Sequence, residues 1–360
     1  MEDSAMPLDT AFSRRLGLDY PLLQAPMAGE TATLALTLEA SRAGALGCIG
    51  AAYFTPDKLR DTIRALRAGT ERTFNINLFM PLPWSVDPAR IAAYQAEITR
   101  AHAELGLPAP DMPTQFEESF DAQIAVVLEE APPVFSFTFG QPSAELMQAL
   151  HARNIYVIGT ATTVAEAVAL EQRGVDAVVA QGMEAGGHRG SFLKPVNQSL
   201  IGTMALVPQM VDAVTIPVIA AGGISDGRGV AAAFCLGAQA VALGSAFLLS
   251  DEAGTSAAYR AALQADGNSE TSLTKAFSGR YARGLRNDFL LRLEGREDAI
   301  PDFPIPNALS RPMRQAAAKQ GKAAYLSLWA GQAAAMARPE PVAAIVQRVM
   351  RQAEAILAKA

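Results

Sequence analysis

Residues 217–229 read PVIAAGGISDGRG, and they give the clearest indication of the fold class. An apolar run, Pro217–Ala221, leads through Gly222-Gly223 to a Ser-Asp pair that opens a segment of helical period. Near-continuous apolar runs are typical of parallel strands buried on both faces, and Ser and Asp are favoured N-cap residues. The stretch therefore predicts a strand, a glycine turn and a helix, which is the repeating unit of parallel α/β folds.

Similar apolar runs recur along the chain, and most are separated by amphipathic stretches. The predicted strands are Pro21–Met27, Leu46–Gly50, Phe74–Phe79, Val134–Phe139, Ile155–Thr160, Ala177–Gln181, Pro217–Ala221 and Ala240–Phe247. Strands alternating with helices in this number, over roughly 250 residues, predict a (β/α)8 TIM barrel. A doubly wound sheet is the alternative, but it usually has fewer strands and a Gly-x-Gly-x-x-Gly turn that APMAGETA, after the first run, does not supply.

Two regions exceed a minimal barrel. Residues 81–133 form a long insertion between the third and fourth strands, and a polar, irregular piece followed by Ala-rich segments lies beyond residue 264. We predict a barrel over residues 1–264 that carries the insertion 81–133. Residues 265–360 are expected to form a smaller, mostly helical lobe that covers the active site, with its last helices packing back on the barrel.

Composition narrows the class of protein. Half of the 360 residues are apolar and 18% are charged, which is typical of a packed globular protein. The net charge of -6 gives no general attraction to nucleic acid or to acidic membranes. The N-terminus, MEDSAMPLDT, lacks the pattern of a signal peptide, and no apolar run is long enough to span a membrane. We therefore expect a cytoplasmic monomer or homodimer that binds neither nucleic acid nor membranes.

The cysteines and two of the histidines predict structural roles only. Cys48 and Cys235 both lie in apolar segments, and we expect buried, reduced thiols. The spacings of zinc sites are absent, so no metal is predicted. His102 and His151 lie in polar helical stretches, where surface positions are expected.

Glycines after the last two predicted strands indicate a phosphate site. Gly222-Gly223 and Gly244-Ser245 follow the seventh strand and the start of the eighth. Glycine lets backbone N–H groups approach phosphate oxygens closely, and a helix N-terminus adds partial positive charge. TIM barrels often bind phosphate between these two loops.

Other strand ends supply a wall for a planar ring and amides at its edge. The small apolar segment at the end of the first strand comprises Pro26, Met27, Ala28 and Gly29. Asn77 and Gln181 end two further strands with side chains that both donate and accept hydrogen bonds. A ring wall, amides and a distal phosphate fit flavin mononucleotide (FMN) better than a sugar phosphate.

The successive motifs QAPMAG, NLF, SFTFG-x-P, QGMEAGGHRG, AAGGISDGRG and GSAF resemble those of the nitronate monooxygenase family. The segment SLWAGQ, residues 327–332, resembles the last motif of its bacterial and fungal class I members. The resemblance covers residues 20–335. It implies an FMN-binding barrel with a second lobe that oxidises alkyl nitronates, such as propionate 3-nitronate, with O2 to a carbonyl product and nitrite.

The resemblance also assigns site residues. It places flavin contacts on Pro26, Met27, Ala28, Gly29, Asn77, Gln181, Gly186, Gly187, Gly222, Gly223, Gly244 and Ser245, and the active-site histidine on His188. Two positions depart from the family pattern. Ser245 stands where threonine is frequent, which preserves the hydroxyl, and Ala333 stands where glycine is usual, which leaves the order of that segment in doubt.

His188 has two chemical roles open to it. A neutral imidazole accepts the carbon proton of a neutral nitroalkane, whereas an imidazolium binds the oxygens of a substrate that is already a nitronate. Arg189 is a candidate for a substrate carboxylate or for a salt bridge on the barrel rim, and Glu184 for orienting His188 or a neighbouring loop.

Candidates for closing the site from the lobe are Ser278, Lys322 and Tyr325. Arg280 and Arg283 are candidates for contacts to the flavin phosphate or to the C-terminal helices.

Three alternatives remain at this stage. A flavin-dependent enoyl-acyl carrier protein reductase or an NAD(P)H:quinone reductase has similar barrel motifs, but SLWAGQ and the long insertion favour the monooxygenase. A flavin-free lyase or isomerase would need a Schiff-base lysine or paired carboxylates, and neither ends a predicted strand. A ligand-binding barrel without turnover is disfavoured by the presence of His188.

Overall fold

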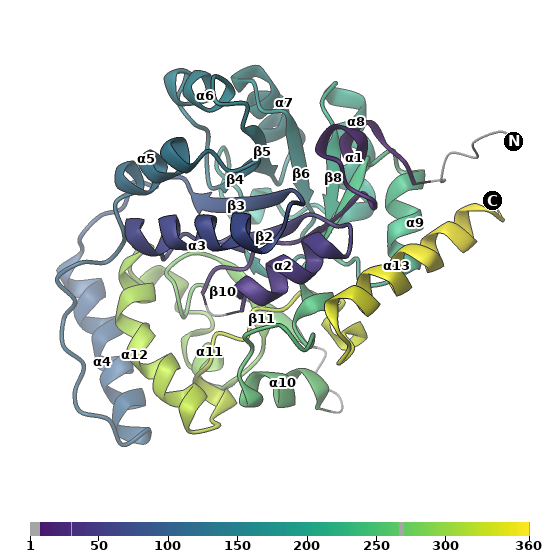
Figure 1. Cartoon of the computed structure of the whole chain (residues 1–360). Coiled ribbons are helices and arrows are strands. Elements are labelled where there is room, and N and C mark those ends of the chain that lie inside the picture. Colours follow the sequence, from purple (N-terminus) through teal and green to yellow (C-terminus); the bar gives the residue numbers. More distant parts are fainter. Residues whose placement is uncertain (1–7, 30, 266–269, 360) are drawn as a thin grey trace, which may run out of the picture.

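The computed structural model describes residues 8–29, 31–265 and 270–359, and its main sheet has eight strands (Figure 1). The strands are β1 (Leu22–Gln24), β2 (Gly47–Gly50), β3 (Phe74–Phe79), β4 (Val134–Thr138), β5 (Tyr156–Ala161), β6 (Ala177–Gln181), β8 (Val218–Ala221) and β9 (Ala240–Leu243). They pair in parallel in the order β1-β9-β8-β6-β5-β4-β3-β2. Leu46, directly before β2, donates its N–H to Leu22 at 2.8 Å and accepts from Gln24 at 3.0 Å. These bonds join the two ends of the sheet, so the predicted (β/α)8 barrel is confirmed.

The first and last strands are shorter than the apolar runs that predicted them. The first strand ends at Gln24, before Pro26, which has no N–H for a ladder bond. The last ends at Leu243, because Gly244 leads into a short 3₁₀ turn over Ser245–Phe247. Both strands therefore end below the loops that carry the predicted site residues.

Helices follow the strands where capping residues begin them. The helices of the barrel and insertion are α1 (Ala11–Leu16), α2 (Leu34–Arg42), α3 (Pro56–Gly69), α4 (Pro88–Glu104), α5 (Phe120–Glu130), α6 (Ala144–His151), α7 (Val164–Arg173), α8 (Thr203–Ala213), α9 (Gly227–Cys235) and α10 (Ala257–Gln264). Thr55 caps α3 ahead of Pro56 at its first position, and Asp226 caps α9 as the opening stretch predicts. Thr163 and Glu166 form a capping box on α7.

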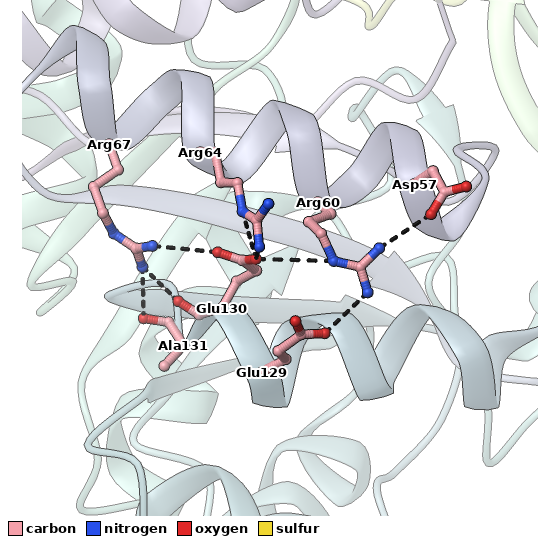
Figure 2. Close-up of polar contacts among 7 residues, drawn as sticks. All are labelled: Asp57, Arg60, Arg64, Arg67, Glu129, Glu130 and Ala131. Carbon is pink, nitrogen blue, oxygen red and sulfur yellow. Dashed lines mark hydrogen bonds and ion pairs between the residues drawn. The ribbon is translucent and has the colours of Figure 1, made fainter.

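The insertion divides between two neighbours. Helix α4 packs on the lobe helix α12 (Ile305–Lys319), and its Ile98 belongs to the same apolar cluster as Leu309. Helix α5 instead packs on α3 on the outside of the barrel. There Arg64 and Arg67 of α3 pair with the buried carboxylate of Glu130 (Figure 2).

The lobe adds a small antiparallel sheet to its helices. Its strands are β7 (Gly187–His188), β10 (Thr271–Thr274) and β11 (Ala282–Leu285), in the order β10-β11-β7. Its helices are α11 (Asp288–Leu293), α12 and α13 (Val342–Leu357). Helix α13, yellow in Figure 1, leaves the lobe and packs against α9 and α2 of the barrel. Since β7 lies in the loop after β6, this sheet ties the barrel to the lobe.

Two sequence-based placements are wrong. His102 is buried on the inner side of α4, because the helix it lies on is covered by the lobe. Cys235 is exposed, because it ends α9 on the face away from the strands; Cys48, on β2, is buried as expected.

Among the residues described, none of the helices combines the length and apolar character needed to cross a membrane. The prediction that the N-terminus carries no signal peptide falls largely on residues 1–7, and the predicted lobe begins beside residues 266–269. Both segments lie outside the described residues.

Candidate active site

A cavity of about 490 Å³ lies between the carboxyl ends of the strands and the lobe. This is the face on which TIM barrels carry their active sites, and the volume is within the usual range of ligand sites. The structure brings His188 and all the residues predicted to contact the flavin to this cavity: Pro26, Met27, Ala28, Gly29, Asn77, Gln181, Gly186, Gly187, Gly222, Gly223, Gly244 and Ser245.

One end of the cavity is formed by the glycine loops after β8 and β9. Gly222 and Gly223 adopt φ of 108° and 73°, a region that favours glycine. Within the described residues, the backbone N–H groups of Gly223, Gly244 and Ser245 donate to no protein oxygen. Ser245 also begins the short 3₁₀ turn after β9. This end therefore presents unsatisfied donors suited to an anion.

Gly186 and Gly187, although adjacent, are glycines for different reasons. A Cβ on Gly186 would lie 2.5 Å from the Gly331 nitrogen, so Gly186 admits the C-terminal segment 329–331. Gly187 has φ of 72° and open space around it, which leaves its backbone accessible. Gly331 completes this junction by donating its N–H to Ser245 Oγ at 2.8 Å.

Polar side chains of β3 and β4 face the cavity from the barrel interior. Asn77 and Asn75 both donate to Ser136 Oγ, at 2.9 and 2.8 Å. Within the described residues, Asn75 Oδ1 is a buried acceptor without a partner. Asn75 and Ser136 are not among the predicted site residues, although Asn75 lies two positions before Asn77 and so shares its face of the strand.

The Gln181 amide holds the loop that carries His188. Its Nε2 donates to the His188 carbonyl at 3.0 Å, and its Oε1 accepts from Gly190 N–H at 2.8 Å. The residue lines the cavity as predicted, but these bonds give it the further task of fixing the loop after β6.

His188 is held jointly by barrel and lobe. Its backbone pairs with Ala282 of β11, and its Nε2 lies 2.9 Å from Ser278 Oγ. Aromatic rings surround the imidazole, with centroid distances of 5.7 Å to Phe79, Phe139 and Trp329 and 6.0 Å to Phe303. Phe139 reaches this position with φ of 79°, a strained conformation for a residue with a side chain.

These surroundings keep the His188 imidazole neutral. Burial lowers the pKa of His188 to about 3, and the positive charges of Arg280 and Arg314 act in the same direction. The imidazole is therefore neutral near pH 7, with a lone pair available to accept a proton.

Arg189 and Glu184 do not contact the imidazole. The Arg189 side chain is fully buried and donates to the carbonyls of Gln181 and Gly182, at 3.0 and 2.6 Å. It forms no salt bridge within the described ranges, and it does not line the cavity, so neither predicted role fits. Glu184 accepts from Thr203 N–H at 3.0 Å and from its hydroxyl at 2.9 Å, and so orients a neighbouring loop.

Of the lobe candidates, only Ser278 contacts His188. Tyr325 bonds Glu104 and Arg292 on the outer side of the lobe, and Lys322 reaches the Glu104 carbonyl. Arg280 stacks on the Phe139 ring, with its guanidinium carbon 4.2 Å from the centroid, and Arg283 donates to the Met183 carbonyl at 3.0 Å. Neither arginine lines the cavity.

The other end of the cavity is cationic, which the sequence did not indicate. Lys58 of α3 and Arg311 and Arg314 of α12 line it together with Tyr53. Arg314 is oriented by Asn307 and Ser310, at 3.0 and 3.1 Å. Neither Lys58 nor Arg311 forms an ion pair within the described residues. Arginines at helical spacing in an Ala-rich segment are common on exposed helix faces. The sequence of this segment therefore does not predict a cationic site.

Comparisons with known proteins agree with this geometry. The sequence pattern of the family described as nitronate monooxygenase matches residues 11–352. A probable nitronate monooxygenase from Staphylococcus aureus (strain Newman) is 43% identical over 346 residues, which are 96% of this chain and 97% of the relative.

Solved structures are similar over the same length. A nitroalkane oxidase from Streptomyces ansochromogenes is 38% identical with a TM-score of 0.90, over 97% of this chain and 99% of that one. FabK from Thermotoga maritima is 30% identical with a TM-score of 0.74, over 98% of each chain.

Proposed function

The chain belongs to the nitronate monooxygenase family of oxidoreductases, and from this premise we propose that it binds FMN and oxidises alkyl nitronates with O2 to a carbonyl product and nitrite. The observation that carries the proposal is His188, a neutral imidazole enclosed by aromatic rings beside the residues that the family pattern assigns to the flavin.

The residues that line the cavity fit FMN. The N–H groups of Gly223, Gly244 and Ser245 would hold the phosphate, which needs several donors in a small space. The segment Pro26–Gly29 would form the wall beside the ring, and the unpartnered Asn75 Oδ1 is an acceptor for a donor on the ring edge. When bound, FMN supplies an electron acceptor that O2 reoxidises.

His188 suits the role of a base. A neutral nitroalkane must lose a carbon proton to become a nitronate, and the lone pair of the neutral His188 imidazole is the group at this site that can accept it. Burial, together with the cations Arg280 and Arg314, disfavours the imidazolium, which supports the base over the charge partner as the role of His188. For a substrate that arrives as a nitronate, no proton needs to be removed.

The cationic end of the cavity favours nitronates of the propionate 3-nitronate type. Lys58, Arg311 and Arg314 can attract a carboxylate, and arginine pairs with carboxylates in a bidentate manner. Glu184 is the acidic residue among the described lining residues, and its carboxylate is engaged by Thr203. A dianionic substrate would thus be oriented with its nitro group toward His188.

Anaerobic mixing tests the proposal. The purified protein should be yellow, and propionate 3-nitronate should bleach the flavin, with nitrite released when air is admitted. NADH and NADPH in parallel samples should leave the flavin oxidised. Bleaching by a reduced nicotinamide but not by the nitronate would favour the enoyl reductase or quinone reductase, and a colourless protein that does not take up FMN would overturn the assignment.

A further inference from the structure

We propose that Ser278 is a positioning residue that keeps the proton of His188 on Nε2, so that Nδ1 carries the lone pair that accepts the substrate proton. The inference rests on the proposed function, because it gives His188 the role of base. Ser278 itself touches neither the substrate nor the flavin in this scheme; it acts through the imidazole.

The hydroxyl of Ser278 has one proton and two acceptors within reach, the Arg280 carbonyl and His188 Nε2. Ser278 Oγ donates to the Arg280 carbonyl at 3.0 Å. The Arg280 N–H in turn lies 3.3 Å from Ser278 Oγ and donates to it. The arrangement that satisfies both groups has the hydroxyl proton on the Arg280 carbonyl and Oγ accepting from His188 Nε2, which lies 2.9 Å away. The proton of the neutral imidazole therefore sits on Nε2.

The other ring nitrogen remains available. Within the described residues, His188 Nδ1 makes no hydrogen bond. The atom is not buried, because it is absent from the buried side-chain atoms without a partner, so solvent reaches it. Because His188 lines the cavity, Nδ1 can be reached by a substrate. Nε2 is thus hydrogen-bonded to Ser278 of the lobe, and Nδ1 can accept the substrate proton.

The loop that presents Ser278 is fixed on several sides. The hydroxyl of Tyr94, from α4, donates to the Ala276 carbonyl at 2.7 Å. Ser310 Oγ, from α12, donates to the Phe277 carbonyl at 2.8 Å. Gly279 turns the chain with φ of 83°, and a Cβ there would lie 2.6 Å from the Phe303 nitrogen. A hydroxyl held this rigidly can impose one orientation on the ring it contacts.

In the part of the chain that the structure describes, no polar side chain other than Ser278 is hydrogen-bonded to the imidazole. Its ring neighbours are Phe79, Phe139, Phe303 and Trp329, whose faces and edges do not select a tautomer. The charged groups that act on it are Arg280 and Arg314, and both disfavour the imidazolium. Without the hydroxyl, the ring would stay neutral but could place its proton on either nitrogen.

His102 provides an internal reference of the opposite kind. Its Nδ1 lies 2.8 Å from the Pro108 carbonyl, which can only accept, so Nδ1 carries the proton. The chain has three histidines, so a sample labelled with ¹⁵N-histidine gives few imidazole signals to assign. The rings of His188 and His102 should report opposite tautomers in the same spectrum.

The test compares Ser278→Ala with Ser278→Thr, which restores a hydroxyl, and with Ser250→Ala. Ser250 is a matched control because its buried hydroxyl donates to the Phe247 carbonyl at 2.9 Å, away from the imidazole. Holoenzyme of each variant is assayed with neutral nitroethane and with its preformed nitronate, and its ¹⁵N imidazole shifts are recorded.

We expect Ser278→Ala to lose about tenfold in kcat/KM on nitroethane and less than about twofold on the nitronate. The loss should be equal at about pH 6 and about pH 8, because the ring is neutral at both. The His188 signals should move toward a mixture of tautomers while those of His102 stay unchanged, and Ser278→Thr should recover both rate and spectrum.

An unchanged His188 tautomer, or equal losses on both substrates, would overturn the inference. These results are distinct from failure of the proposed function. In that case the wild-type protein would oxidise neither nitroethane nor its nitronate, while the ¹⁵N spectra would still report whether Ser278 sets the tautomer. An unchanged His102 signal shows in each variant that the lobe has kept its packing.

Discussion

The barrel and the lobe line the cavity with different types of residue. The barrel wall consists of strand ends and glycine loops, with short amides and free backbone donors at Asn77, Gly223 and Ser245. The lobe wall contributes large rings and cations, among them Trp329 and Arg314, in addition to Phe79 and Lys58 of the barrel. The barrel wall suits a phosphate and a planar ring. The lobe wall encloses the remaining space and makes it positively charged.

The residues of the two walls are positioned in different ways. Barrel residues sit on loops that directly follow buried strands, so their positions are set by the sheet. Lobe residues reach the cavity through contacts that are distant in sequence, such as Gly331 with Ser245. The walls meet at His188, which follows a barrel strand, pairs with β11 and is bonded by Ser278.

The largest effect is expected where the walls meet. His188→Asn should lower kcat/KM on neutral nitroalkanes by about 10²–10⁴-fold, the usual contribution of a general base. FMN binding, which we assign mainly to the barrel wall, should be preserved, as the flavin absorbance and its titration into apoprotein would show. Preformed nitronates should be affected far less. Retained turnover of neutral nitroalkanes would show that His188 is not the base.

A smaller effect is expected at the seam between the walls. Gly331→Ala would place a methyl 2.7 Å from the Glu184 carbonyl oxygen and 3.0 Å from the Gly186 nitrogen. The segment 329–331 would have to move, and Ser245 would lose its N–H donor. We expect the Kd for FMN to rise by about tenfold, the factor given by the loss of a well-formed hydrogen bond and its packing.

Gly321→Ala is the matched control for this seam. Gly321 has φ of 71°, and no atom lies within 4 Å of the place that an added methyl group would take. An alanine there therefore strains the lobe locally without touching the cavity. Titration of each apoprotein with FMN, followed by fluorescence, separates the two cases. Equal weakening by both substitutions would mean that general loss of stability, and not the seam, controls flavin affinity.

The sequence predicts the barrel wall well because that wall is local. Each apolar run predicts a strand, and the glycines and amides that follow it line the cavity. The sequence does not show which group each side chain is hydrogen-bonded to. Arg189 looks like a ligand for a carboxylate, yet its partners are the carbonyls of the strand end just before it.

The lobe wall is harder to predict because its residues carry no pattern of their own. Phe303 and Arg311 lie in a polar, proline-containing stretch without a motif, and they reach the site through tertiary packing of the lobe. His102 is misplaced for the same reason, since α4 is covered by a lobe some 200 residues later. Ser278 is found only as one of several polar candidates.

A further effect is expected if the lobe wall excludes water from the His188 imidazole. The pKa of His188 is about 3 in the folded protein against an ordinary 6.5. As the pH falls below 6.5, the unfolded chain takes up a proton that the folded protein does not, so stability is lost. At about pH 5 this amounts to about 1–2 kcal/mol, after allowance for solvent in the cavity.

Urea unfolding at about pH 7 and about pH 5 measures this effect. The wild-type protein should lose more stability between the two pH values than His188→Asn does, by that amount. Trp329→Ala, which opens the ring cage from the lobe side, should show an intermediate loss because water then reaches the imidazole. If wild type and His188→Asn lose the same stability, the cage does not depress the pKa.

The smallest effect is expected on the outside of the barrel, where α3 and α5 are joined by ion pairs and neither wall is involved. Glu130 is buried and accepts from Arg64 at 2.8 Å and from Arg67 at 3.4 Å, whereas Glu129 pairs with Arg60 in solvent (Figure 2). Glu130→Gln should lower the free energy of unfolding by about 1 kcal/mol, and less at high salt, because one carboxylate serves more than one arginine. Glu129→Gln, the matched control, should leave Tm unchanged within error.

Both variants should keep wild-type FMN affinity and kcat/KM. A change in KM for propionate 3-nitronate in Glu130→Gln alone would mean that α3, whose first turn presents Lys58 to the cavity, couples the barrel exterior to the cationic end of the site.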